Sequence, residues 1–188
     1  MSRSPRSPFV AGARIFLRYP RKNDLEEFTG LVIASRRFLH PWATPAATPE
    51  AYAHYLRYTR RASVCAGLIC RNEDRRIMGV CSLSQIFLGN LKSAYLGYWI
   101  GAKFARQGYM TEAIDLMLSH AFETLRLHRI EANIQPENAS SIAVVSRLGF
   151  RLEGFSPCYL KVAGRWKDHE RWAICCDEWA KRLPRKSS

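Results

Sequence analysis

A junction between an apolar stretch and an amphipathic stretch has the features of an anion-binding site. The segment GYWIGAKFARQGYMTEA passes from a strand-like run that ends near Gly101 to a helical pattern that begins at Gly108. The first turn of a helix has free N–H groups and the positive end of the helix dipole, which together bind phosphates. Gly108 permits close approach of a ligand to the backbone, and Arg106 adds a positive charge. The segment is neither a P-loop nor a dinucleotide-binding fingerprint, and an ordinary strand-to-helix turn is the alternative.

A second group of polar residues, Asn138-Ala139-Ser140-Ser141, precedes a short amphipathic stretch. Asn138 is suited to cap a helix, which would place Ser141 in its first turn. There the Ser141 hydroxyl has two alternatives, a bound ligand or the local backbone. Both alternatives remain open from the sequence.

Three segments, ARQGYMTEA, HRIEANIQPENASSIAVVSRLGFRLEG and YLKVAGRWKDHERWAI, together resemble the GCN5-related N-acetyltransferase (GNAT) superfamily. They look like its bacterial branch that acetylates the N-terminal alanine of a small-subunit ribosomal protein. The resemblance extends from about Ile15 to Trp179. It implies transfer of an acetyl group from acetyl-CoA to an amine by direct attack in a ternary complex. It also implies a single α/β (α+β) domain, with a mixed, mostly antiparallel sheet flanked by helices and splayed between its fourth and fifth strands.

The resemblance places the pantetheine arm of acetyl-CoA between the strands at Ala94–Ile100 and His128–Gln135, and its pyrophosphate over Ala105–Thr111. Ala105 and Met110 depart from the family pattern Arg/Gln-x-x-Gly-x-Gly/Ala, but most contacts in that loop come from the backbone. The residues implied for cofactor binding are Trp99, Ile100, Gly101, Ala105, Arg106, Gln107, Gly108, Tyr109, Met110, Thr111, Asn138 and Arg147, with Lys103 as a further partner of the phosphates.

The resemblance also suggests the groups that move protons. Many relatives use a Tyr to protonate the departing CoA thiolate, but the matching residue here is Val145. The branch offers Ser141, in the motif that Asn138 begins, as a replacement, and an ordered water is the alternative. Some relatives use a Glu as general base where this chain has Tyr95, which we expect to hold a water as proton relay.

A site with a weak base favours one class of acceptor. A protein α-amine has a pKa of ~7.7–8.0, so roughly a tenth to a fifth of it is neutral at pH 7. A lysine side chain, with a pKa of ~10.4, is neutral in only about 1 molecule in 2,500. The absence of a carboxylate at position 95 therefore suits an N-terminal amine better than a lysine.

Aromatic residues in two segments are expected to line the acceptor site. Phe38, His40 and Trp42 belong to the loop after the first helix, and Tyr159 and Trp166 belong to the C-terminal hairpin. Packing anchors for loose loops are the alternative reading. A narrow aromatic slot suits a small first residue such as Ala or Ser. Two other functions stay open: acetylation of a small-molecule amine (an antibiotic, toxin or amino acid), and a non-catalytic RNA- or ribosome-binding module of the same fold.

Length and charge limit the choice of partners. The chain has 188 residues, of which 47% are hydrophobic, and this fits one domain and excludes a fibrous or disordered chain. Its 29 Lys and Arg exceed its 16 Asp and Glu, giving a net charge of +13. That charge favours anionic partners such as RNA and phosphorylated cofactors, and disfavours polycationic substrates. We expect a flexible basic arm over 1–8, the catalytic domain over 9–180 and a basic tail over 181–188.

Localisation and metal content are also expectations at this point. No apolar run approaches the ~20 residues of a membrane span, and residues 1–10 lack a secretory signal, so we expect a cytoplasmic protein without a membrane contact. The six cysteines include no Cys-x-x-Cys pair, and we interpret them as buried thiols without a metal. The protein partner expected from the resemblance is a ribosomal protein or the ribosome, and the oligomeric state stays open.

The elements that must position these residues follow from periodicity, in the order β-α-α-β-β-β-α-β-α-β-β. Asn23 or Asp24 is expected to cap the first helix, and Thr48 the second. The strand Ala94–Ile100 carries apolar residues at alternate and intervening positions, so both of its faces are expected to be buried. The predicted strands are 14–18, 64–71, 76–85, 94–100, 128–135, 150–162 and 165–176; helices are expected from 25, from 49, over 108–125, and from 139 to a stop at Gly149.

Overall fold

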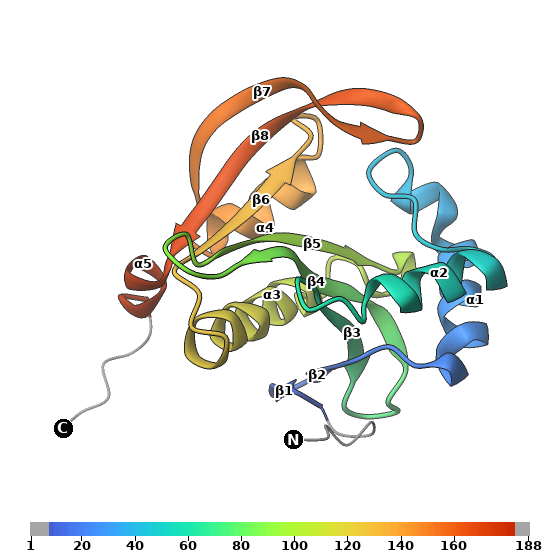
Figure 1. The fold of residues 1–188 in the computed structure, drawn as a ribbon. Coiled ribbons are helices and arrows are strands. Elements are labelled where there is room, and N and C mark those ends of the chain that lie inside the picture. Colours follow the sequence, from blue (N-terminus) through green and yellow to red (C-terminus); the bar gives the residue numbers. More distant parts are fainter. Residues whose placement is uncertain (1–7, 183–188) are drawn as a thin grey trace.

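Eight strands form one sheet in the order β1-β2-β3-β4-β5-β6-β8-β7 (Figure 1). The computed structural model describes residues 8–182. Every neighbouring pair of strands runs antiparallel except β5 and β6, which are parallel. The strands are β1 (Val10–Ala11), β2 (Ile15–Arg18), β3 (Cys65–Arg71), β4 (Ile77–Phe87), β5 (Ser93–Ile100), β6 (Arg129–Ile134), β7 (Arg151–Val162) and β8 (Arg165–Cys175). The expected mixed, mostly antiparallel sheet is confirmed.

Helices cover both faces of this sheet. Successive residues of a strand point to opposite faces. On β5, Trp99 packs against Phe28 of one helix, while its neighbour Tyr98 bonds to Ser141 of another. The helices are α1 (Leu25–Leu39), α2 (Pro49–Tyr58), α3 (Tyr109–Ser119), α4 (Ala139–Arg147) and α5 (Cys176–Ala180), with short helical turns η1 (Lys22–Asp24), η2 (Ala102–Phe104) and η3 (His120–Thr124). Thus α1 and α4 lie on opposite faces of β5.

Two predicted helix caps are confirmed by their hydrogen bonds. The Thr48 hydroxyl accepts a bond from the Ala51 N–H at 3.2 Å, with Pro49 as the first residue of α2. The Asn138 side chain accepts from the Ser141 N–H at 3.2 Å and so starts α4. Gly149, with φ of +80°, follows the end of α4 in the left-handed conformation that glycine adopts at little cost.

The residue before α1 does not form the N-cap hydrogen bond that the sequence predicted. Asp24 is the residue that precedes α1, but its carboxylate does not cap the helix. Instead it accepts two bonds of 2.7 Å from the Arg18 guanidinium and one of 2.8 Å from the Arg21 N–H. Asp24 and Arg18 are both buried, so each charge needs the other as a partner.

The predicted helix over 108–125 is only partly right. The regular part, α3, ends at Ser119, and η3 continues as a π-helical turn closed by the bond from the Leu125 N–H to the His120 carbonyl at 3.0 Å. Three consecutive residues, His120, Ala121 and Phe122, are buried there. The end of this helix is therefore covered on more than one side.

The two ends of the chain add elements that periodicity did not predict. β1 has only two residues, and α5 takes over Cys176, which was expected to end the last strand. Residues 1–7 and 183–188, which hold most of the expected basic arm and tail, lie outside the described part of the chain. Within residues 8–182, no helix has the length and apolar character needed to cross a membrane.

The prediction for the cysteines is right for three and wrong for the others. All six are free thiols, and Cys65, Cys70 and Cys81 are buried. Burial raises the pKa of Cys70 to about 11, so it remains a neutral thiol. Cys158 is exposed because it lies in an irregular part of β7 with φ of +49°, and the two cysteines at the start of α5 are half-buried.

The parallel contact between β5 and β6 is short. Pairing is confined to Ser93 with Arg129, Ala94 with Ile130, and Tyr95 with Glu131. Beyond Tyr95 the two strands separate, which confirms the expected splay and leaves backbone groups of both strands without a strand partner. Gly97 is exposed at this opening, so the expectation that both faces of β5 are buried is wrong there.

Candidate active site

The end of β5 is fixed against β4 and free toward β6. A Cβ added at Gly79 on β4 would lie 2.2 Å from the Trp99 carbonyl oxygen, so this close strand approach requires glycine. The Trp99 ring also meets the Phe28 ring edge-on, with centroids 5.5 Å apart. Trp99 and Ile100 are therefore held at the border of the opening, both half-buried.

The loop that follows β5 is anchored through small and buried residues. The Gly101 N–H donates to the Met78 carbonyl at 2.8 Å, and the Ala102 N–H donates to the Ser35 hydroxyl at 3.0 Å. Phe104 is buried beneath the loop, 6% exposed. This arrangement holds Ala105 and the residues after it at the surface.

The residues before α3 form a concave turn of backbone. Arg106 and Gly108 both have left-handed conformations, with φ of +61° and +79°. The first backbone bond of α3 runs from the Glu112 N–H to the Gly108 carbonyl at 3.1 Å. Within the described residues, the N–H groups of Tyr109 and Thr111 have no backbone acceptor, as expected of a first helical turn. Such groups can bind an anion.

Met110 shows why its departure from the family pattern is tolerated. Its side chain is only 9% exposed and lies in the core cluster, while the neighbouring Gln107 and Arg106 are exposed. The methionine side chain therefore points away from the surface where a ligand would lie. The Gln107 side chain steadies the loop by donating to the Lys103 carbonyl at 2.9 Å.

Arg14, which immediately precedes β2, contacts this loop, and the sequence did not predict that contact. Its guanidinium donates to the Glu112 carboxylate at 2.8 Å and to the Gln107 carbonyl at 2.9 Å, and stacks 4.7 Å from the centre of the Tyr109 ring. A Cβ at Gly108 would lie 3.2 Å from its terminal nitrogen. A separation of 98 residues from Glu112 explains why no local pattern could predict this cation.

Ser141 meets a partner on β5 across the sheet. Its hydroxyl donates to the Tyr98 phenolic oxygen at 2.7 Å, and the Tyr98 hydroxyl donates back to the Ser141 carbonyl at 3.3 Å. Burial raises the pKa of the Tyr98 phenol well above its ordinary value, so the ring stays neutral. Val145, one turn further along α4, is fully buried in the core. Ser141 and Tyr98 are thus neutral hydroxyl groups that bond to each other across the sheet.

Tyr95 is positioned by a second aromatic hydroxyl. A hydrogen bond with the Tyr159 side chain, together with burial, raises the pKa of Tyr95 to about 12. Glu131 and Arg171 also act on Tyr95 electrostatically, in opposite directions. Tyr95 is therefore a neutral phenol that can hold a water but cannot remove a proton from an ammonium group near neutral pH.

The other residues predicted for the acceptor site stand apart from this pair. Phe38 and Trp166 are 46% and 62% exposed, His40 is exposed, and Trp42 is half-buried. The loop after α1 and the β7–β8 turn lie toward the same side of the molecule in Figure 1, but among the described residues no ring contact joins them. Of the five residues predicted for the acceptor site, only Tyr159 bonds to a residue of β5, namely Tyr95.

Two further features of the described residues concern Arg147, predicted to bind the cofactor, and the side chains that could hold a metal ion. Arg147 is exposed in the last turn of α4 and has no ion pair among the described residues. Within residues 8–182 no group of three or more His, Cys, Asp or Glu is arranged to hold a metal ion.

These features fit an acyltransferase that uses a phosphorylated carrier. They are the opened mixed sheet, the free backbone N–H groups at the start of α3 and the neutral hydroxyl groups. The sequence profile described as "Acetyltransferase (GNAT) domain" matches residues 14–151, and the chain belongs to this family. It is an N-acetyltransferase, and acetyl-CoA is its co-substrate.

Three similar proteins illustrate the range of the family. The Bacillus subtilis protein YjcK is 33% identical over 174 residues, which cover 88% of this chain and 96% of that protein. The [ribosomal protein uS5]-alanine N-acetyltransferase of Escherichia coli is 28% identical, covering 88% and 90% of the two chains. The structure of Mycobacterium smegmatis RimJ in complex with CoA-disulfide has a TM-score of 0.83 and 30% identity, covering 91% of this chain and 89% of that one.

Proposed function

We propose that this enzyme acetylates the α-amine of a protein N-terminus, with the alanine of a ribosomal protein as the favoured acceptor. The Escherichia coli relative bears that activity in its name and matches most of this chain. The names of relatives leave the acceptor of this chain open, and the chemistry of the site favours an α-amine.

The observation that carries the proposal is the pairing of the two carboxylates beside the site. Glu112, at the start of α3, is bound by Arg14, and Glu131, the register partner of Tyr95, is bound by Arg129 at 2.9 Å. Both carboxylates are therefore occupied as hydrogen-bond acceptors of a guanidinium, and neither is a free carboxylate placed to act on the acceptor amine. An α-amine, already partly neutral at pH 7, tolerates a weak base much better than a lysine does.

The loop before α3 is the part of the site that would bind the cofactor. The pyrophosphate of acetyl-CoA would lie over Ala105–Thr111, bonded by backbone N–H groups from Gly108 onward. Arg14, Lys103 and Arg106 would surround it with positive charge. The pantetheine arm would bond to backbone groups of β5 and β6 that the splay leaves free.

The reaction then needs only positioning and two proton transfers. The neutral amine attacks the thioester carbonyl carbon, a C–N bond forms and the C–S bond breaks. The Ser141 hydroxyl turns from Tyr98 to protonate the departing thiolate and regains a proton from solvent. A water held by Tyr95 relays to solvent the proton that the amine loses. Asn138 acts through the helix start, because it fixes the Ser141 backbone. Holding amine and thioester together contributes most of the acceleration.

Mass spectrometry of acetylated peptides tests the acceptor. The enzyme would be incubated with acetyl-CoA and with peptides that begin with Ala, Ser or Met, or that have a blocked N-terminus and an internal lysine. We expect the acetyl group on the α-amine of the Ala and Ser peptides, and on alanine when ribosomal proteins are offered. Acetylation confined to free small amines, or to the lysine side chain, would contradict the proposal.

A further inference from the structure

A cavity of about 350 Å³ lies between the start of α1 and helix α2. None of the residues that line it belongs to β5 or β6, so it is separate from the site of acetyl transfer. The two helices contact each other through the Phe28 and Tyr52 rings, whose centroids are 4.9 Å apart. Lys22, Arg57 and Arg60 line the cavity and no Asp or Glu does, so it carries a positive charge.

The three cations of this cavity have no carboxylate partner. Within the described part of the chain they are exposed and form no ion pair. Asp24, two residues after Lys22, is bound by Arg18 at 2.7 Å. Glu50 is engaged at the start of α2, where hydrogen bonds with its own backbone and with Thr48 lower its pKa. The three positive charges are therefore available to an anion from outside the chain.

Helix stability explains only one of these cations. Arg57 lies in the last turn of α2, where a positive charge interacts favourably with the helix dipole. Arg60 follows the end of that helix, and Lys22 comes from the turn before α1. Like charges from separate elements that line one cavity repel each other, and an anion bound between them removes this cost.

The rest of the cavity wall is apolar. Leu25 and Leu56 are half-buried, and Tyr52 is only 1% exposed, with its hydroxyl committed to the Arg21 carbonyl at 2.8 Å. A nucleotide combines a flat base with a phosphate and so matches an apolar wall beside cations. An acidic peptide has its charges on side chains without a ring. Guanidinium groups also bind phosphates through a planar fork.

We infer that this cavity binds single-stranded RNA, with phosphates on Lys22, Arg57 and Arg60 and one unstacked base against Leu25 and Leu56. The cavity would hold the enzyme on the RNA beside its acceptor. The choice of RNA rests on the proposed function, since a ribosomal protein is met together with RNA.

A strand fits this surface better than a free nucleotide does. The Arg60 N–H donates to the Arg57 carbonyl at 3.4 Å, which keeps the two arginines one turn apart and able to meet different phosphates. Arg61 continues the row, exposed and with its guanidinium 5.4 Å from the centre of the Tyr58 ring. The net charge of +13 further attracts a polyanion.

Fluorescence anisotropy with a labelled uridine oligonucleotide of about 12 nucleotides tests the inference. In the triple variant Lys22→Gln, Arg57→Gln, Arg60→Gln, the Kd should rise at least about tenfold. The slope of log Kd against log salt concentration should also fall by about two, because each phosphate contact on a single strand contributes about 0.7. Glutamine is a good helix former, so α2 should persist.

A second triple variant, Lys92→Gln, Arg126→Gln, Lys181→Gln, is the matched control. It removes the same net charge from exposed positions outside the cavity. Remote charges are screened by salt, so the Kd for the oligonucleotide should stay within about twofold of the wild-type value. Equal losses in the two triple variants, or a wild type that does not bind the oligonucleotide, would overturn the inference.

Ala53→Leu tests the apolar part of the cavity at constant charge. Ala53 lines the cavity and is exposed, so the larger side chain fills the space for the base. The Kd for the oligonucleotide should rise about tenfold with an unchanged salt slope. Ala51→Leu places the same side chain on α2 outside the cavity lining and should bind like the wild type. If both variants bind equally well, no base enters the cavity.

Two further probes separate RNA from other anions. If oligoglutamate or uridine monophosphate binds as tightly as the oligonucleotide and is lost in the Lys22, Arg57, Arg60 variant, the partner is an acidic protein or a free nucleotide, and the inference is wrong. That variant should acetylate a free Ala-peptide with wild-type kcat and KM, which shows an intact fold. If the wild type acetylates only small amines, the proposed function fails, while the anisotropy measurement still decides whether the cavity binds RNA.

Discussion

The Ser141 hydroxyl lies 2.7 Å from the phenolic oxygen of Tyr98, and this contact joins the first turn of α4 to the splayed part of β5. The Tyr98 hydroxyl is committed to the Ser141 carbonyl. Ser141 is therefore held in one orientation by a neutral partner. The only partner of the Ser141 hydroxyl among the described residues is thus a neutral phenol, which is not a base that could activate a serine nucleophile.

Replacing Ser141 by Ala should lower kcat at least about a hundredfold, with KM for both substrates within a factor of about two. The reason is that the lost hydroxyl acts on the leaving group and not on binding. Steady-state kinetics with acetyl-CoA and an Ala-peptide measures this. Ser140→Ala is the matched control, since the Ser140 hydroxyl bonds only to Asn138, and it should retain wild-type kcat. Equal turnover in the Ser141 variant would assign the proton to a water.

Gly108→Leu should raise the Kd for acetyl-CoA by at least about tenfold. Two effects act together: φ of +79° disfavours any side chain, and the added group would stand beside Arg14, where the proposed site places the phosphates. Isothermal titration calorimetry gives the Kd. Gly89→Leu is the control for backbone strain, because Gly89 also has a positive φ, of +68°, and has open space around it. If both variants bind acetyl-CoA equally well, the loop is not the phosphate site.

Arg14→Ala should weaken acetyl-CoA binding about tenfold and also make the loop less ordered. The guanidinium holds the Gln107 carbonyl and supplies positive charge beside Gly108. Arg14→Lys should recover part of the affinity, because it keeps the charge but loses the forked contact. An Arg14→Ala variant with wild-type affinity would show that this arginine only ties β2 to α3.

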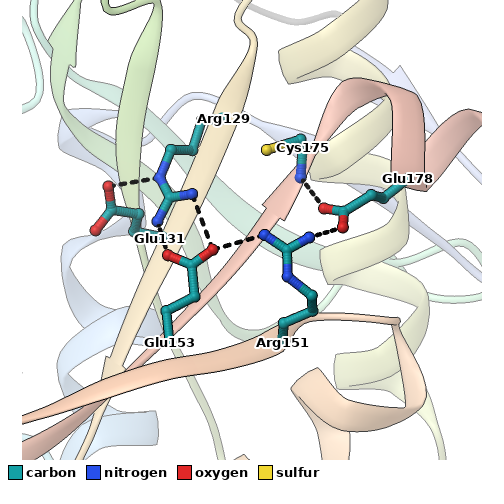
Figure 2. A network of polar contacts seen from close by, with 6 residues as sticks. All are labelled: Arg129, Glu131, Arg151, Glu153, Cys175 and Glu178. Atoms are coloured by element: carbon teal, nitrogen blue, oxygen red, sulfur yellow. Dashed lines mark hydrogen bonds and ion pairs between the residues drawn. The ribbon is translucent and has the colours of Figure 1, made fainter.

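A chain of alternating charges joins β6, β7 and α5 (Figure 2). Glu131, Arg129, Glu153, Arg151 and Glu178 follow one another as ion-pair partners. The Arg129 guanidinium holds the pKa of Glu153 well below its ordinary value, at about 2. This network fixes the β7–β8 hairpin to the strand that borders the opening.

Stability should fall with acid through Glu153. Its pKa is lower in the folded protein than in the unfolded chain, so the stabilisation is complete above about pH 5 and is lost as pH falls toward 2. Glu153→Gln should therefore reduce stability at pH 7 and flatten the dependence of the unfolding free energy between pH 5 and 2. Urea titrations at a series of pH values measure this. Glu73→Gln, at a carboxylate that is 79% exposed, should leave the curve unchanged.

Local patterns predicted the elements well where one residue fixes an end. Thr48 and Asn138 start their helices through a side-chain bond, and Gly149 ends one through its positive φ. The π-helical turn after Ser119 was missed because apolar periodicity continues through it. β1 was missed because two residues are too few to show an alternation.

The site was less predictable because its contacts connect distant parts of the chain. Gly108 and Ser141 stand in recognisable motifs, but their partners do not. Arg14 is 98 residues from Glu112, and Tyr98 is 43 residues from Ser141. Such pairs depend on the strand order, and periodicity gives the strands without their order.

Crystals of the enzyme grown with acetyl-CoA would show directly where the cofactor binds. We expect the pantetheine arm between β5 and β6, the pyrophosphate over the residues before α3, and the thioester sulfur within hydrogen-bonding distance of the Ser141 hydroxyl. A saturating carrier bound elsewhere, with the β5–β6 opening closed around protein atoms alone, would contradict this placement.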